Sequence, residues 1–195
     1  MSGLGTRKPF VCRPVSIQWR GSPASLDSSK TALSAAAYIR RTRFELSGMD
    51  AIDFVKRRDD LLAVKPFLPS DEPEWTRSTY LRWKKADEVS EATANPEDIR
   101  AWHVVGDLPE GATPGEWLDG CSTLVQRCLP RNAVADLALH VPQGDTPPHM
   151  HLLVASRKAD SFGYHAIDYD LHRQLDVELR IAWLEWCTVP LPLAS

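Results

Sequence analysis

The residues with the clearest capacity for chemistry are three histidines in LALHVPQGDTPPHMHLLVASR, residues 137–157. His149 and His151 are two positions apart in an apolar run, so in a β-strand both imidazoles share one face, with Cα atoms about 6.6 Å apart. If residues 141–148 close a hairpin, His140 at the end of the preceding strand lies opposite this pair. Three neutral imidazoles at one point suit a divalent transition metal or zinc. The pattern predicts a metal site; the alternative is a histidine pair at a sheet edge that binds no metal.

A second candidate is Tyr38, in the alanine-rich segment SSKTALSAAAYIRRTRFEL. The small side chains before it let another backbone approach closely, and Arg40, Arg41 and Arg43 after it supply phosphate ligands. A tyrosine hydroxyl has an ordinary pKa near 10, so it becomes a nucleophile only with help from a metal or a base. The alternative is a buried aromatic ring on an alanine-rich packing face.

The composition bounds the class of protein. A chain of 195 residues with 43% hydrophobic and 25% charged residues indicates one soluble globular domain. Its apolar stretches are shorter than a membrane span, and its first residues lack the apolar core of a secretory signal. The four cysteines form no C-x-x-C pair, which excludes a zinc ribbon or a thioredoxin-like motif. Their spacing does not resemble a disulfide framework and favours a reduced, cytoplasmic setting. We expect no membrane segment and no secretion.

Charge is distributed unevenly along the chain. Residues 1–90 hold 16 Lys and Arg against 11 Asp and Glu, whereas residues 91–195 hold 7 against 15, for a net charge of −3. A basic half beside an acidic half indicates one face for a polyanion, and the alternative is a chance asymmetry on a solvated surface.

The elements that must position these residues follow from hydrophobic periodicity and from proline and glycine breakers. Strands are predicted over Phe10–Arg20, Ile99–Leu108, Ala133–His140 and His149–Ser156. The first is an edge strand, because Pro14 interrupts it. Helices are predicted from Ser28 or Ser29 to about Leu46, from about Glu72 to about Ala92, from Thr113 to about Leu129, and over Asp168–Cys187. Residues 50–70 stay ambiguous. This order predicts an α+β fold, with a central, mostly antiparallel sheet and the helices packed on one side.

Three stretches in this order resemble the MobA/MobL relaxases, plasmid-mobilisation enzymes of the HUH endonuclease superfamily. SAAAYIRR (34–41) is similar to the helix that bears the family's nucleophilic tyrosine, and EPEWTRSTYLRWKKADEVSE (72–91) to its proline–tryptophan segment and following helix. VADLALHVPQGDTPPHMHLLVASR (134–157) is similar to its three-histidine metal motif. The resemblance implies an HUH-relaxase-like fold and a single relaxase-like domain over 1–195, with an N-terminal strand region at 1–27 and an irregular tail at 188–195.

The resemblance also assigns roles to residues. It implies that Tyr38 is the nucleophile and that His140, His149 and His151 are ligands of a divalent cation, Mg²⁺ or Mn²⁺. In such enzymes the tyrosine attacks a phosphodiester of single-stranded DNA at a plasmid transfer origin. A 5′-phosphotyrosine link forms and a 3′-hydroxyl is released, in the bacterial cytoplasm and in some systems with accessory mobilisation proteins.

Single-stranded DNA is expected to follow the basic half of the chain. Arg40, Arg41 and Arg43 are the predicted phosphate contacts, and Trp75 or Trp83 is a predicted stacking platform. For both tryptophans core packing is the alternative, and it is the favoured one for Trp83.

The chain departs from the family pattern near the predicted metal site. Eight residues, instead of the usual seven, separate His140 from His149, and we expect the loop to absorb the extra one. The family's two glutamates, six and four residues before a proline, are replaced by His103 and Val105 in RAWHVVGDLP. If the glutamates help to activate the tyrosine or to position the metal, we expect their loss to weaken catalysis, unless His103 takes over their role.

Three functions therefore stay open. The first is an active relaxase, which retention of the tyrosine and the three histidines favours. The second is a degenerate relaxase domain that binds single-stranded DNA or metal without cleavage, which loss of the glutamates favours. The third is an unrelated three-histidine metal hydrolase with Asp136 as its general base.

Overall fold

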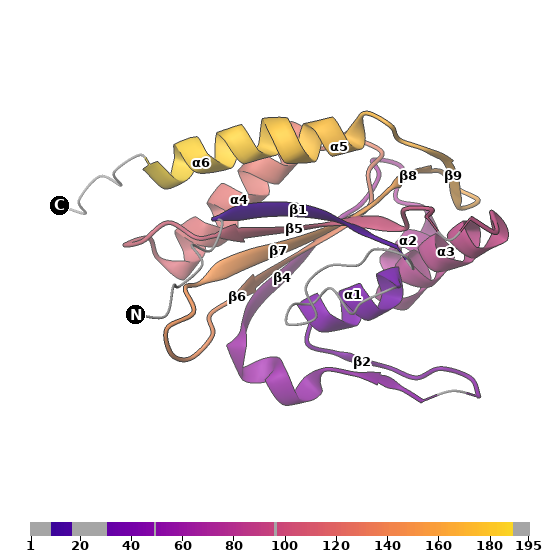
Figure 1. Ribbon diagram of the computed structural model, residues 1–195, viewed down its shortest axis with the longest axis horizontal. Helices are drawn as coiled ribbons and strands as arrows, with labels where there is room; N and C mark the ends of the chain where they lie inside the picture. The colour runs from indigo at the N-terminus through magenta and orange to yellow at the C-terminus, as the bar shows by residue number, and fades with distance from the viewer. Residues whose placement is uncertain (1–8, 17–30, 49, 96, 189–195) are drawn as a thin grey trace.

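The centre of the molecule is a five-stranded antiparallel sheet (Figure 1). The computed structural model describes residues 9–16, 31–48, 50–95 and 97–188. In spatial order the strands are β1 (Phe10–Val15), β5 (Ala101–Asp107), β7 (His149–Ala155), β6 (Ala135–His140) and β4 (Leu61–Phe67). Every neighbouring pair runs antiparallel, as the sequence predicts.

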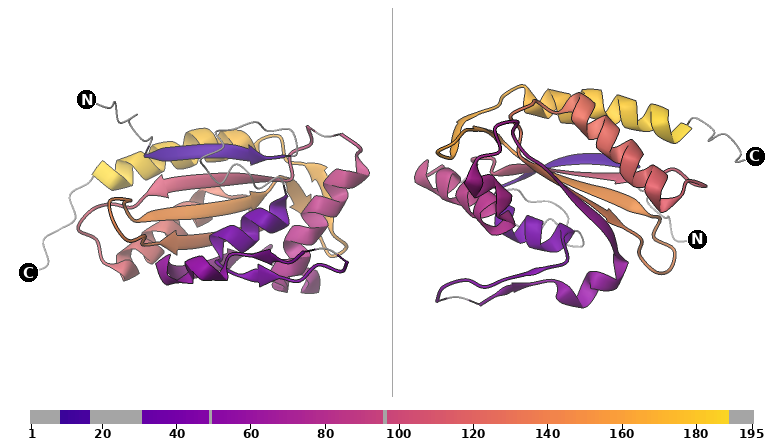
Figure 2. Two further views of the ribbon diagram at one scale, coloured as in Figure 1. Left: turned by 60° about the horizontal axis from the view of Figure 1, so that its bottom comes forward. Right: turned by 180° about the vertical axis from the view of Figure 1, so that it is seen from behind.

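Helices cover both faces of the sheet, so the expectation of helices on one side is wrong (Figures 1 and 2). One face carries α1 (Ala32–Ile39), α2 (Glu74–Arg77) and α3 (Thr79–Ala92). The other face carries α4 (Pro114–Cys128), α5 (Leu171–Arg173), the π-helical segment η3 (Gln174–Leu179) and α6 (Arg180–Thr188). The reason lies in the central strands: every residue of β6 and β7 is buried, so both faces of these strands need cover.

Side chains along β6 and β7 alternate between two hydrophobic cores. Leu137, Leu139 and Met150 belong to the core under α4 and α6, whereas Ala138 and Leu153 belong to the core under α1 and α3. The histidines share the parity of Ala138 and Leu153, so strand geometry places them on the α1 face.

Short elements complete the chain. β2 (Arg43–Phe44) pairs with β3 (Ile52–Asp53), and the 3₁₀ segment η2 (Val55–Asp60) leads into β4. The ambiguous residues 50–70 thus become a strand, a 3₁₀ turn and an outer strand of the sheet. β8 (Arg157–Ala159) and β9 (Tyr164–Ile167) form a separate hairpin.

The predicted strands are found, with shifted ends. β1 is an edge strand, and its Pro14 pairs with Trp102 of β5. Residues 17–20 of the predicted strand, most of the N-terminal region 1–27 and residues 189–195 of the predicted tail lie outside the described residues. No helix in the described ranges is long and apolar enough to cross a membrane.

The helices differ more from prediction. The first ends at Ile39 rather than Leu46, because Arg41 adopts a left-handed φ of 50° and Arg43 enters β2. It begins after the cap Thr31, while Ser28 and Ser29 lie outside the described residues.

The later helices fit the predicted spans more closely. The helix predicted over 72–92 is divided into α2 and α3 at Ser78, whose side chain caps α3. The helix that opens at Thr113 is confirmed, with a complete capping box between Thr113 and Glu116. The helix predicted over Asp168–Cys187 contains the π-helical segment.

Two glycines of α4 provide a matched test of how α6 packs against α4. A Cβ at Gly120 would overlap the indole ring of Trp186, whereas a Cβ at Gly115 would meet no atom within 4 Å. Alanine is the better helix former at both positions. We therefore expect Gly120→Ala to lower the free energy of unfolding by about 1–3 kcal/mol through overpacking. Gly115→Ala should leave it unchanged or raise it by at most about 1 kcal/mol. Urea denaturation of both variants measures the difference; equal stabilities would show that α6 does not pack on α4 as described.

Candidate functional site

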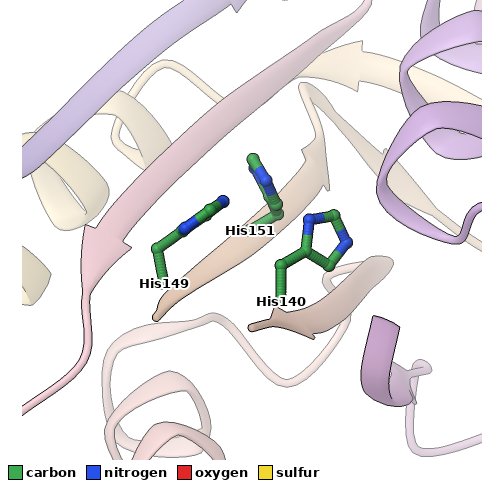
Figure 3. Close-up of side chains that lie close together, drawn as sticks. All are labelled: His140, His149 and His151. Atoms are coloured by element: carbon green, nitrogen blue, oxygen red, sulfur yellow. The ribbon is translucent and has the colours of Figure 1, made fainter. Parts of the chain in front are cut away.

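The β6–β7 hairpin brings the three histidines together at one end of the two strands (Figure 3). His140 pairs directly with His149, and His151 pairs with Ala138 one step inward. One ligand nitrogen from each ring lies within 4.8 Å of the others. The ring centroids are 4.5 Å apart for His140 and His151 and 4.9 Å apart for His149 and His151. The extra residue in the connecting loop has not displaced the cluster.

Two of the histidines are oriented as metal ligands require. Nδ1 of His149 donates to the carbonyl of Pro147 at 2.9 Å, which makes Nε2 the ring's acceptor nitrogen. Nδ1 of His151 lies 3.0 Å from Nε2 of His103. Nε2 of His151 is buried and has no hydrogen-bond partner among the described residues. Because an unsatisfied buried nitrogen is costly, this atom fits a site that is completed by a cation.

His140 is held differently, because both of its ring nitrogens have partners. Nε2 donates to the carbonyl of Ile39 at 2.8 Å, and Nδ1 accepts from the Arg41 guanidinium at 3.0 Å. A ring that donates through Nε2 presents Nδ1 to a metal, so the Arg41 guanidinium stands at the ligand position. Burial and the nearby Arg41 charge lower the pKa of His140 to about 4, so the ring is neutral at physiological pH.

Tyr38 lies in the last turn of α1, above the histidines. Its ring centroid is 5.5 Å from that of His151 in an edge contact and 6.2 Å from that of His140. The roles that the family resemblance assigns to Tyr38 and to the histidines require this proximity. Phe54 also packs edge-on against the phenol, with ring centroids 5.4 Å apart, and the tyrosine is only 9% exposed. The phenol is therefore covered.

Arg41, a predicted phosphate contact, is buried inside the site. Its guanidinium forms two hydrogen bonds of 2.7 Å with Asp60 and one of 3.0 Å with the carbonyl of Tyr38. Its Cζ lies 4.2 Å from the centroid of the Tyr38 ring. A positive φ at a residue with a side chain is strained, and such strain persists where surrounding contacts impose it.

Asp60 is the site residue that sequence reasoning missed. Partial burial raises the pKa of its carboxyl, but the hydrogen bonds and the charge of Arg41 outweigh this effect and lower the pKa below its ordinary value. Its position follows from the pairing of β4 with β6, in which Leu61 lies opposite His140. No local signal reveals that pairing, since Asp60 looks like the end of a solvated charge run.

The other predicted DNA contacts are placed less favourably than expected. Arg40 donates to Asp136 at 3.2 Å and is mostly buried, whereas Arg43 is half exposed and pairs with Glu45 and Asp53. Trp75 is buried, with its indole N–H on the carbonyl of Asp160 and its ring against Tyr164. This burial favours the core-packing alternative for Trp75 over the predicted stacking platform.

Asp136 is not available as a general base. The carboxylate is fully buried and accepts from Arg82 at 2.8 Å, from Arg40 at 3.2 Å and from the Trp83 indole at 2.7 Å. It lies at the far end of β6 from His140, two strand steps of the same face away. The geometry gives no support to a metal hydrolase built on this residue.

The two positions that depart from the family pattern both lie at the site. Val105 pairs directly with His151, and His103 is its diagonal neighbour on the same face of β5. His103 contacts His151 through a ring stack with centroids 5.1 Å apart as well as through the nitrogen contact. Burial, followed by the charge of Arg13, lowers the pKa of His103 to about 3, so His103 is neutral.

Comparison with known proteins agrees with the family resemblance of the sequence. The sequence model of the MobA/MobL family matches residues 30–175. The chain belongs to the MobA/MobL family. That span holds the tyrosine helix, the replaced glutamate positions and all three histidines, and membership supports a plasmid-mobilisation relaxase. Among curated proteins, none matches the sequence.

One solved structure supports the fold. A protein from a study of the molecular basis of vancomycin resistance transfer in Staphylococcus aureus superposes with a TM-score of 0.69. The match covers 95% of this chain and 97% of the other at 16% identity. At this identity the likeness establishes a shared architecture.

The buried histidines make stability depend on pH. His103 is neutral in the folded protein down to pH about 3, whereas in the unfolded chain it binds a proton near pH 6.5. The free energy of unfolding that depends on a neutral His103 is therefore fully present above pH 6.5. It is lost as the pH falls toward 3, by up to about 1.4 kcal/mol per pH unit. Between pH 7 and pH 5, metal-free wild type should lose about 2 kcal/mol more stability than His103→Gln. Urea unfolding with a chelator present measures this, and parallel losses in the two proteins would show that His103 does not stay neutral.

Proposed function

We propose that the protein is a relaxase that cuts single-stranded DNA at a plasmid transfer origin through Tyr38. The observation that supports this most directly is the position of the Tyr38 ring, 5.5 Å from His151, over three histidines whose ligand nitrogens lie within 4.8 Å of one another. A nucleophile beside a cation site is what attack on a phosphodiester requires. The protein would act in the bacterial cytoplasm, where its four cysteines stay free thiols, and accessory mobilisation proteins are possible partners.

The proposed reaction is a transfer of the phosphoryl group to tyrosine. The Tyr38 oxygen forms a bond to phosphorus and gives up its proton, while the bond to the 3′ oxygen breaks and that oxygen takes up a proton. The products are a 5′-phosphotyrosine diester and a free 3′-hydroxyl. Because one phosphodiester replaces another, the reverse reaction rejoins the strand without ATP.

The histidine cluster would hold a divalent cation, Mg²⁺ or Mn²⁺, through His140, His149 and His151. The unpartnered Nε2 of His151 and the carbonyl-oriented ring of His149 support this assignment. When bound, the cation would withdraw charge from the scissile phosphate and orient it for in-line attack.

His103 acts in this proposal as a positioning residue. A contact of 3.0 Å between its Nε2 and Nδ1 of His151 can fix the tautomer in which His151 carries its proton on Nδ1 and presents Nε2. Metal-ligating histidines commonly donate their second N–H to a carboxylate or a carbonyl, and here a neutral imidazole takes that place.

A specific observation also favours the second candidate, a relaxase domain that binds without cutting. Arg41 occupies Nδ1 of His140, and neither His103 nor Val105 supplies the carboxylate of the family pattern. If the guanidinium keeps this position, only two histidines are left to hold a cation, and the DNA would be bound without strand transfer.

Replacing Tyr38 by Phe separates the two candidates. Tyr38→Phe removes the attacking oxygen alone, so we expect complete loss of the covalent protein–DNA adduct. Binding of a single-stranded transfer-origin oligonucleotide should be unchanged, and in both proteins it should weaken steeply with salt. Denaturing gel electrophoresis with labelled DNA and Mn²⁺ measures the adduct. Tyr80→Phe is the matched control and should retain it. A wild type that binds this DNA but forms no adduct would favour the binding domain.

Removing Arg41 tests His140 as a ligand without reference to activity. Glycine suits the left-handed φ of this position, so Arg41→Gly can keep the backbone. It removes a positive charge from Nδ1 of His140 and releases the Asp60 carboxylate, and both changes favour a cation. We expect Mn²⁺ to bind at least about tenfold more tightly, a gain of about 1.4 kcal/mol or more. Calorimetric titration of this variant and of the exposed control Arg43→Gln measures the effect. Unchanged affinity in Arg41→Gly would show that His140 does not ligate the metal.

A further inference from the structure

A second group of metal-ligating side chains lies on the opposite face of the sheet from the histidine cluster. It combines Cys12 of β1, His172 of α5 and Asp176 of η3. One donor atom from each residue lies within 4.8 Å of the others, and Nε2 of His172 is 4.0 Å from a carboxylate oxygen of Asp176. Cys12 packs against the core under α4 and α6, whereas the three histidines are on the α1 face. The two groups are therefore separate.

The surrounding structure holds these side chains in place. The His172 ring stacks on Trp102 of β5, with centroids 4.3 Å apart and planes inclined by 16°. Trp102 pairs with Pro14, two residues from Cys12 and on the same face of β1, so the stack holds His172 over the thiol's strand. Asp176 lies inside the π-helical segment, a backbone form that is frequent at functional sites.

We propose that Cys12, His172 and Asp176 form a second metal site that takes a divalent ion of the zinc class and leaves its fourth position to water. A thiolate, an imidazole and a carboxylate are the three donor types that zinc accepts, and three protein ligands with an open position is a known zinc arrangement. On binding, the thiol loses its proton to solvent and a metal–sulfur bond replaces the S–H bond. The ion would join the edge strand β1 to the C-terminal helical segment.

The charges around the group are compatible with this site. Asp176 also pairs with Arg180 at 2.6 Å, and its carboxylate has two oxygens with which to serve the arginine and a cation. Burial, with a contribution from Asp176, raises the pKa of the Cys12 thiol to about 12. Without a metal the thiol therefore keeps its proton, and a role as a reactive nucleophile is disfavoured.

Cobalt titration of the metal-free full-length chain tests the proposal. A thiolate bound to Co²⁺ gives a charge-transfer absorption in the near ultraviolet that histidine and carboxylate ligands do not produce. The three-histidine site cannot generate this signal, so the result is independent of the proposed function. We expect the absorption in the wild type and in His149→Ala. Added Zn²⁺ should displace the Co²⁺ and abolish the absorption.

Variants assign the signal to its ligands. Cys12→Ser should abolish the absorption, and His172→Ala, at a half-exposed side chain, should weaken cobalt binding at least about tenfold. Two matched controls should retain it. Cys187→Ser removes another partly exposed thiol. His165→Ala removes a histidine that is as exposed as His172 and also pairs with an aspartate, but does not belong to the group. Absence of the absorption in the wild type, or its persistence in Cys12→Ser, would overturn the proposal.

Discussion

The buried carboxylate of Asp136 is the constraint on which the arrangement of Tyr38 and the three histidines depends. It is fully enclosed in β6 and accepts hydrogen bonds from Arg82 and Trp83 of α3 and from Arg40, which follows α1. A buried charge is tolerated only when it is paired and its hydrogen bonds are satisfied. The fold therefore requires these three donors to remain bound to the carboxylate. Loss of one partner from such a pair typically costs about 3–5 kcal/mol. The strand that carries His140 is thereby tied to both helices above it.

The same helix, α3, also fixes the other end of the tyrosine helix. Asp87 accepts from the backbone N–H groups of Ala32 and Leu33 at 2.7 and 3.0 Å. An eight-residue helix is marginal by itself, and an anion at its N-terminus stabilises it through unsatisfied N–H groups and the helix dipole. With Asp87 at its start and Asp136 bound just beyond its end, α1 has little freedom to slide. This explains how Tyr38 is held over the histidines without a bond of its own to them.

Prediction from the sequence succeeded where the signal is local and failed where it depends on pairing between distant segments. Alternation along a strand and a short hairpin connection are enough to place His140 beside His149 and His151. Helix propensity and periodicity predict that the first helix continues past Arg41 to about Leu46. The prediction is wrong because no local pattern reveals that Arg41, bonded to Asp60 and His140, adopts a left-handed conformation. Asp60 lies at the site only because β4 pairs with β6, and that pairing joins distant segments. The second layer of helices was not predicted because β7 is buried on both faces and therefore shows no alternation of polar and apolar residues.

The donor set also determines which cation the site should favour. His103 and Val105 are neutral where the family has glutamates, and the Asp60 carboxylate is already paired with Arg41. Three imidazoles without a carboxylate carry no charge, so a bound dication would be balanced only by Asp60 and by the DNA phosphate. Mg²⁺ seeks hard oxygen ligands and gives up water reluctantly, whereas imidazole suits borderline transition metals. If the histidines hold a cation as proposed, we expect replacement of the two glutamates to shift the preference of the site away from Mg²⁺ and toward cations that bind nitrogen ligands. The DNA phosphate would then supply the negative charge that the protein does not provide.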